Sequence, residues 1–140
     1  EKHRRFIGIV HADPDDPNPS NPTSWIAATQ GTYLPEGVYF DPVASASQGW
    51  TTSSMDIEFP RNIAKSQGSG EEFYYYEFNS NGTMALGFEN DWLVLQAGTL
   101  RPGSGGNLEI VVEEDQESLV AALIFRRVGT TTQVTDPTIF

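Results

Sequence analysis

The chain has 140 residues and a formal net charge of −11 at pH 7, since 8 Lys and Arg residues are outnumbered by 19 Asp and Glu residues. The hydrophobic fraction of 38% is enough for a buried core and excludes a wholly disordered chain. Long stretches without Lys or Arg leave no basic stripe, so we expect no nucleic-acid partner and no binding to anionic membranes. The longest apolar run, Leu119–Phe125, is far too short for a transmembrane helix.

Apolar residues recur with a period of two, and Gly, Pro, Ser, Thr and Asn interrupt the chain at short intervals. This pattern predicts an all-β protein with eight or nine short strands and at most a short helical turn. The expected strands lie near Arg4–Ala12, Trp25–Thr29, Thr32–Asp41, Trp50–Phe59, Glu72–Asn79, Thr83–Glu89, Trp92–Thr99, Leu108–Glu113 and Ser118–Val128.

These strands predict one β domain over residues 1–128, folded as a mostly antiparallel barrel, with a β-sandwich or jelly roll as the alternative. Residues 13–23 contain four prolines and are expected to form a long exposed loop within the domain. Residues 129–140 are expected to be a C-terminal tail.

Two short turns suggest a register for the middle of the chain. Asn81-Gly82 is typical of a two-residue type I′ hairpin, and Asn90-Asp91 is interpreted as a second tight turn. The resulting register gathers most of the aliphatic side chains on one face. That face carries Phe73, Tyr75, Glu77, Met84, Leu86, Phe88, Leu93, Leu95 and Ala97.

Glu77 is out of place on this aliphatic face, because burial of a carboxylate without a partner is costly. Desolvation would raise its pKa, so Glu77 with Tyr75 is a candidate acid–base pair. The alternative is that Glu77 lies at a strand end and reaches solvent. The expected ligand-binding residues of an interior cavity are Trp50, Phe73, Met84, Leu86, Phe88 and Leu95.

The opposite face provides an alternative site, an aromatic platform of Tyr74, Tyr76 and Trp92 with Gln96 at its margin. Such rings can stack on sugars or anchor a partner. They can equally pack beneath a loop or against a second sheet.

We expect neither a metal site nor a cofactor. The chain has no cysteine and only two histidines, and the oxygen-rich segment Asp13–Asn18 lacks EF-hand spacing, so it is interpreted as a solvated loop. Nucleotide-binding and nucleophile-elbow motifs are missing. The glycines of 103–106 predict a hairpin loop.

An early tryptophan, Trp25, and a final strand ending in Arg126 and Arg127 resemble calycin-type barrels, in which an Arg packs across a Trp. The resemblance covers these positions only, because Ser24 precedes the tryptophan and the Gly-x-Trp pattern is missing. It implies no more than a barrel fold.

The sequence therefore predicts a small barrel that binds an apolar or amphipathic organic molecule, with cofactor-free isomerase, cyclase or lyase chemistry if it is an enzyme. The alternatives are a non-catalytic carbohydrate-binding or adhesion module and a structural subunit of an assembly. Because several strands are apolar on both faces, we also expect a homodimer.

Overall fold

The computed structural model describes residues 4–15, 18, 21–59, 71–103, 105 and 108–140. The chain divides into two compact units. Unit 1 consists of Glu1–Arg5, Leu34–Thr52 and Glu77–Phe140, and unit 2 consists of Phe6–Tyr33 and Ser53–Tyr76.

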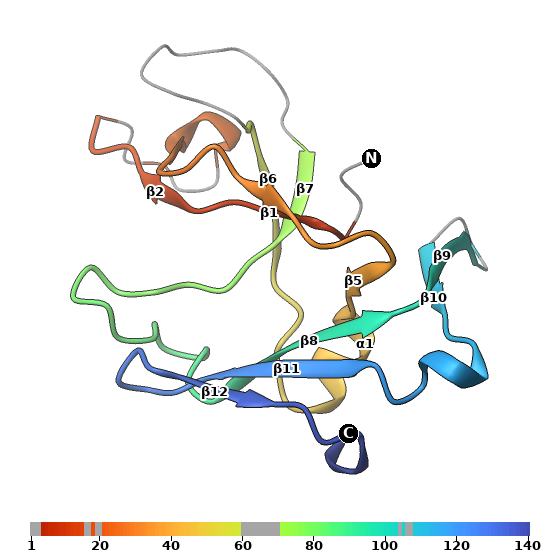
Figure 1. Cartoon of the computed structure of the whole chain (residues 1–140). Coiled ribbons are helices and arrows are strands. Elements are labelled where there is room, and N and C mark those ends of the chain that lie inside the picture. The colour runs from red at the N-terminus through yellow and green to blue at the C-terminus, as the bar shows by residue number, and fades with distance from the viewer. Residues whose placement is uncertain (1–3, 16–17, 19–20, 60–70, 104, 106–107) are drawn as a thin grey trace. The chain divides into compact units, whose positions relative to one another are not determined.

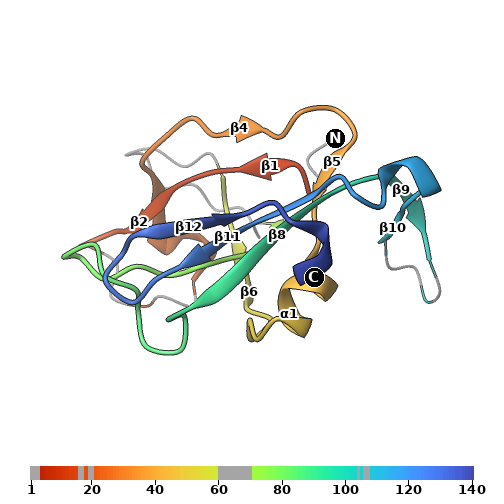
Figure 2. The ribbon, with the colours of Figure 1, turned by 60° about the horizontal axis from the view of Figure 1, so that its bottom comes forward.

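Unit 1 is built around a four-stranded antiparallel sheet with the strand order β12-β11-β8-β5 (Figure 1). A separate hairpin of β9 and β10 continues from the end of β8, as Figure 2 also shows. The regular elements of the unit are β5 (Val38–Phe40), α1 (Pro42–Ser47), β8 (Asp91–Ala97), β9 (Thr99–Pro102), β10 (Leu108–Val111), η3 (Glu114–Gln116), β11 (Val120–Phe125), β12 (Thr131–Val134) and η4 (Pro137–Ile139).

Unit 2 contains three two-stranded antiparallel pairs: β1 with β4, β2 with β3, and β6 with β7. The ring of Phe6 lies edge-on to the rings of Tyr33 and Phe59, at centroid distances of 5.3 and 5.1 Å. The elements are β1 (Phe6–Ile7), β2 (Val10–Ala12), η1 (Pro22–Ser24), β3 (Trp25–Ala27), β4 (Thr32–Tyr33), β6 (Ser54–Ile57) and β7 (Glu71–Tyr74).

Strand β8 is the central strand of unit 1, and it pairs with β11 over six consecutive residues. Both strands come from the most apolar stretches of the sequence, so their pairing removes two apolar surfaces from water at once. Val94 is fully buried at 0% exposure, and Ala122, which lies opposite it on β11, and Ile124 are buried as well.

On the other side of β8, the edge is shared between β5 and α1. Strand β5 pairs with β8 as far as Phe40 opposite Leu95, and there the chain turns into α1. The N–H of Asp41 donates to the carbonyl of Val94 (2.8 Å), and the N–H of Val94 donates to Oγ of Ser45 (2.9 Å). The Ser45 hydroxyl in turn donates to the carbonyl of Asp41 (2.7 Å). Helix α1 thus provides hydrogen-bond partners for the backbone groups of β8 that β5 leaves unpaired.

The helix begins where it does because Asp41 is a good N-cap. Its side chain accepts a hydrogen bond from the N–H of Ala44 (3.0 Å), and Pro42 occupies the first turn, where no N–H is needed. With six residues, α1 is the short helical segment that the sequence allowed.

The all-β prediction is confirmed, since twelve strands and one α-helix make up the regular structure of the described residues, apart from 3₁₀ turns. Among the described strands no sheet closes on itself, so the barrel stays a prediction. The pairing of β9 with β10 confirms the expected hairpin, and residues 104 and 106 of its predicted loop lie outside the described residues.

The register predicted from Asn81-Gly82 is wrong. Only Gly82 has a positive φ (+87°), whereas a type I′ turn needs two such residues, and Phe78 bridges to Met84 instead of facing Ala85. The expected strand Thr83–Glu89 does not form, because the chain turns again at Gly87, where φ is +91°. The single aliphatic face inferred from that register therefore does not exist.

The second turn also differs from the prediction. Asn90 does have a positive φ of 62°, but the turn closes one residue earlier, with the N–H of Asp91 donating to the carbonyl of Phe88 (3.3 Å). Strand β8 then pairs with β11 and β5 rather than folding back on residues 83–89. Strand β11 has a larger apolar surface than residues 83–89 and is therefore the better partner for β8.

The expected tail and loop contain more structure than the sequence suggested. Residues 129–140 include β12, the edge strand of the main sheet, and the ring of Phe140 lies edge-on to Trp92 at 5.7 Å. In the loop of residues 13–23, the N–H of Asp13 donates to the carbonyl of Ser24 (2.7 Å). Residues 16–17 and 19–20 of that loop lie outside the described residues.

We predict that Ser45→Ala lowers the free energy of unfolding of unit 1 by about 1–3 kcal/mol, because it leaves the buried N–H of Val94 without an acceptor. Urea denaturation followed by tryptophan fluorescence would measure the loss. Ser47→Ala is the matched control, since that hydroxyl is exposed and bonds only within the helix (2.8 Å to the carbonyl of Ala44). The control should stay within about 0.5 kcal/mol of the parent, and an equal loss in both variants would contradict the bridging role.

Candidate functional site

The candidate site lies in unit 1, where the segment from Asn79 to Glu89 meets the turn between β11 and β12. The segment begins with a tight loop: the N–H of Asn79 donates to the carbonyl of Thr83 (2.7 Å), and the side chain of Asn81 accepts from both the N–H (3.1 Å) and the hydroxyl (2.7 Å) of Thr83. These bonds give the loop one backbone conformation.

Two contacts hold this loop against the β11–β12 turn. The N–H of Met84 donates to the carbonyl of Arg127 (3.1 Å). Gly129 has a φ of +90°, and a Cβ atom there would lie 2.1 Å from the carbonyl oxygen of Gly82. Only glycine permits this approach, so the backbones of the two turns are in direct contact.

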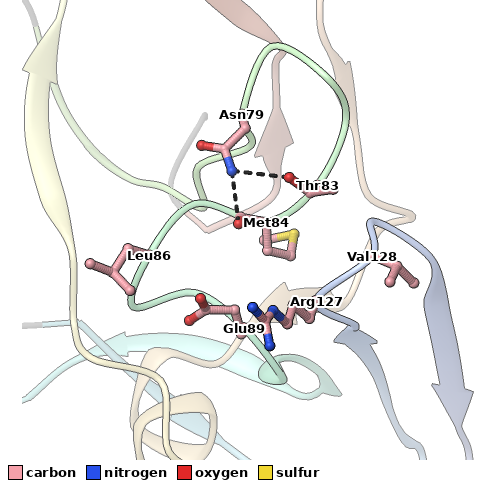
Figure 3. Close-up of a pocket in the computed structure, with 7 residues that line it drawn as sticks. All are labelled: Asn79, Thr83, Met84, Leu86, Glu89, Arg127 and Val128. Atoms are coloured by element: carbon pink, nitrogen blue, oxygen red, sulfur yellow. Dashed lines mark hydrogen bonds between the residues drawn. The ribbon is translucent and has the colours of Figure 1, made fainter.

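Between the two turns is an open pocket with a volume of about 360 Å³ (Figure 3). Met84 is its buried apolar wall, while Leu86 and Val128 are aliphatic residues that are 93% and 70% exposed. Its polar lining consists of Asn79, Thr83, Glu89 and Arg127. The amide nitrogen of Asn79 donates to Oγ1 of Thr83 (3.0 Å) and to the carbonyl of Met84 (3.1 Å), as Figure 3 shows.

The two charged residues of the pocket have few partners. The carboxylate of Glu89 accepts one hydrogen bond, from the N–H of Gly87 (3.0 Å). Within the described part of the chain, the guanidinium of Arg127 makes no ion pair and no hydrogen bond, whereas the neighbouring Arg126 donates through Nε to Oγ1 of Thr132 (3.0 Å). Arg127 is therefore a cation that is available to an anionic group in the pocket.

Asp91 lies two residues beyond Glu89 and is buried, with 6% exposure. Burial raises the pKa of the Asp91 carboxyl, and the negative charge of Glu89 raises it further. Its Oδ2 has no hydrogen-bond partner among the described residues. Asp91 is thus a desolvated acid next to the pocket segment, although it does not line the pocket itself.

The proposed acid–base pair is divided between the two units. Glu77 belongs to unit 1 and is exposed, and Tyr75 belongs to unit 2, where its N–H donates to the carbonyl of Ser53 (3.1 Å). The desolvation on which the acid–base hypothesis depended is missing at Glu77.

The predicted ligand-binding residues are also dispersed. Met84 and Leu86 line the pocket. Trp50, Phe88 and Leu95 lie elsewhere in unit 1; Trp50 is buried edge-on to Phe40 (5.6 Å), and Phe88 is buried.

The sixth predicted ligand-binding residue, Phe73, belongs to unit 2, where its ring is 6.3 Å from that of Phe6.

The alternative platform is divided in the same way, with Tyr74 and Tyr76 in unit 2 and Trp92 and Gln96 in unit 1. The amide nitrogen of Gln96 donates to the backbone carbonyls of Ala97, Gln116 and Leu119 (3.0–3.2 Å), so it holds the chain around β8 together. A platform of Tyr74, Tyr76, Trp92 and Gln96 stays a prediction.

No group of three or more potential metal-ligating side chains (His, Cys, Asp or Glu) occurs within the ranges that the structure describes. In the same ranges no helix is long and apolar enough to cross a membrane.

Asn79, Thr83, Glu89 and Val128 were not predicted as site residues, and Arg127 entered only through the resemblance to calycin-type barrels. One signal was available, because two adjacent arginines follow a stretch of 24 residues, 102–125, that contains no Lys or Arg. An isolated pair of cations in an acidic chain is a reasonable candidate for a specific contact.

Comparison with known proteins gives no match: no protein-family model, no curated protein and no solved structure is significantly similar to this chain.

The buried carboxyl predicts a pH-dependent stability. Because the pKa of Asp91 is raised in the folded state, its ionised form opposes folding at neutral pH, and this penalty disappears as the pH falls through the raised pKa towards the ordinary value of 3.8. Asp91→Asn should therefore raise the melting temperature at pH 7, and the gain should shrink as the pH falls towards 3.8.

Thermal melts of the parent and Asp91→Asn between pH 3.5 and 8 would test this. Asp115→Asn is the control, because it makes the same change in charge at an exposed position. A lower melting temperature for Asp91→Asn at pH 7 would show that the ionised carboxylate has a stabilising partner.

Proposed function

We propose that this protein is a binding protein for a small amphipathic carboxylate, which occupies the pocket between the Asn79–Glu89 segment and the β11–β12 turn. The observation that carries the proposal is the guanidinium of Arg127, which has no partner among the described residues and shares the pocket lining with three aliphatic or thioether side chains. A carboxylate on Arg127 and an alkyl chain along Met84, Leu86 and Val128 would use both kinds of surface.

The size and composition of the pocket support a small ligand. Its volume of about 360 Å³ is at the lower end of the range for small-molecule sites, roughly 300–1,000 Å³. Leu86 is 93% exposed, and a large apolar side chain so fully in water gains most from a ligand that covers it. The barrel interior expected from the sequence is not part of this proposal, because the sheets of the described strands stay open.

The proposal includes no catalytic step. Glu89 is the pocket's carboxylate, and we assign it a selective role: it disfavours ligands that place a second negative charge in the pocket and accepts a hydrogen bond from a hydroxyl or amide on the ligand. The ligand class expected from the sequence is kept, and its location is changed from a closed cavity to this open pocket.

Titration with octanoate, octylammonium and octanol, followed by amide chemical shifts, would test the function. These probes share one alkyl chain and differ in the charge of the head group. We expect octanoate to shift the amides of residues 79–89 and 126–128 at the lowest concentration, despite the net charge of −11. Stronger binding of octylammonium would mean that the overall negative field dominates, and the proposal would be wrong.

The role of Arg127 can be isolated with its neighbour as the control. Arg127→Gln should weaken octanoate binding by about ten- to a hundredfold, which corresponds to a lost hydrogen bond to a charged group of roughly 1.5–3 kcal/mol. Arg126→Gln makes the same change in net charge one residue away, at a guanidinium that already bonds to Thr132. An equal loss in both variants would indicate a nonspecific effect of charge.

A further inference from the structure

The two edge strands of the main sheet of unit 1, β5 and β12, differ in whether their outer sides are covered. The outer side of β5 is partly covered, since the N–H of Phe40 donates to the carbonyl of Arg4 (2.7 Å). Strand β12 has β11 as its one neighbour among the described strands. Figures 1 and 2 show β12 at the end of the sheet, beside β11.

The hydrogen-bond pattern shows which backbone groups of β12 face outward. The N–H of Arg126 donates to the carbonyl of Thr130 (2.8 Å), and β11 and β12 are antiparallel with Ile124 opposite Thr132. In an antiparallel pair, hydrogen-bonded residues alternate with non-bonded ones. Thr132 and Val134 therefore direct their N–H and C=O groups at β11, and Thr131 and Gln133 direct theirs away from the sheet.

The other side of β11 gives the same assignment. The N–H of Ala97 donates to the carbonyl of Leu119 (3.0 Å), so the odd-numbered residues of β11 bond to β8 and the even-numbered residues are left for β12. The side chains of Thr131 and Gln133 are exposed as well.

Strand β12 carries none of the features that protect an edge from pairing. Its sequence is Thr-Thr-Gln-Val, with no proline, lysine or other charged residue, and both its threonines and its valine are β-branched. The strand itself is neutral, in a chain whose formal net charge is −11.

We propose that β12 is a dimerisation edge, which pairs in antiparallel fashion with β12 of a second copy of this chain. Under two-fold symmetry, Thr131 of each copy faces Gln133 of the other, and their outward N–H and C=O groups form four backbone hydrogen bonds. The two four-stranded sheets then form one continuous sheet of eight strands. This inference does not depend on the ligand pocket.

The charges next to β12 favour the antiparallel arrangement and a second copy as partner. Arg126 and Arg127 precede the strand, and Asp136 follows it. Hydrogen bonds from the N–H (3.0 Å) and hydroxyl (2.8 Å) of Thr138 lower the pKa of Asp136, so it is ionised at neutral pH. Antiparallel pairing brings the basic end of each strand to the acidic end of the other, and parallel pairing would bring like charges together.

Analytical ultracentrifugation would measure the association from about 20 μM to about 1 mM, the range expected for a small and transient interface. We expect the average mass to rise towards twice the 15.4 kDa of the chain, more readily at 0.5 M than at about 0.05 M NaCl, because salt screens the repulsion between two acidic copies. A chain that stays monomeric over this whole range would overturn the proposal.

Gln133→Pro and Gln133→Ala form the matched pair of variants. Proline removes the outward N–H and places its ring at the new interface, and alanine keeps the N–H and removes only the side chain. The dimer should be lost in Gln133→Pro and retained in Gln133→Ala, with circular dichroism showing that both are folded. A dimer that survives in folded Gln133→Pro would show that another surface mediates it.

Hydrogen exchange of the parent protein provides a test that needs no variant. As the concentration rises, the amides of Thr131 and Gln133 should become at least several-fold more protected, because pairing buries them, and those of Thr132 and Val134 should change little. Equal protection of all four amides, or no change in any of them, would contradict this register.

Discussion

The hydrogen bond from the Val94 N–H to the Ser45 hydroxyl is the constraint on which unit 1 depends, because a central strand needs partners along both of its edges. Strand β5 supplies one edge only as far as Leu95, and Ser45 with Asp41 supplies the rest. With that edge satisfied, β8 can be buried and can pair along its whole length with β11. The position of β11 then determines where the β11–β12 turn lies, and hence where Arg127 meets the loop around Met84. The pocket is thus a distant consequence of the hydrogen bond between α1 and β8.

The net charge and the pocket act on a ligand over different distances. A charge of −11 repels a carboxylate as it approaches, but at physiological ionic strength this field is screened beyond about 8 Å. Contact with Arg127 acts within hydrogen-bond range, where screening is weak. The global field should therefore slow association more than it weakens the bound state, and a carboxylate can be the preferred ligand of an acidic protein.

Much of the fold could be predicted from the sequence, but the site could not. The strands around Leu93 and Leu123 are long apolar runs whose type depends on little else, and the glycines of 103–106 encode a hairpin locally. Helix α1 has only six residues and is stabilised by β8, a tertiary partner that has no local signal. The predicted aliphatic face failed at Asn81-Gly82, where a longer loop shifted the register by one residue, so that Phe78 bridges to Met84 and no longer faces Ala85. The pocket joins residues some forty positions apart through Gly82 and Gly129, and such a contact has no periodicity to detect.

The β11–β12 hairpin contributes Arg127 to the proposed pocket and β12 to the proposed dimer edge. Ligand binding and dimerisation are therefore thermodynamically coupled. A ligand carboxylate on Arg127 would compete with its attraction to Asp136 of the other copy. Exposed ion pairs contribute at most about 1 kcal/mol, and the two-fold dimer contains this pair twice, so each bound ligand should weaken the dimer by no more than about fivefold. The backbone bonds of Thr131 and Gln133 are not part of that competition. The turn cannot readily change shape either, since Gly129 is in contact with the backbone of Gly82. The same reciprocity means that dimerisation can weaken ligand binding only by that small factor, so the pocket remains usable in both the monomer and the dimer.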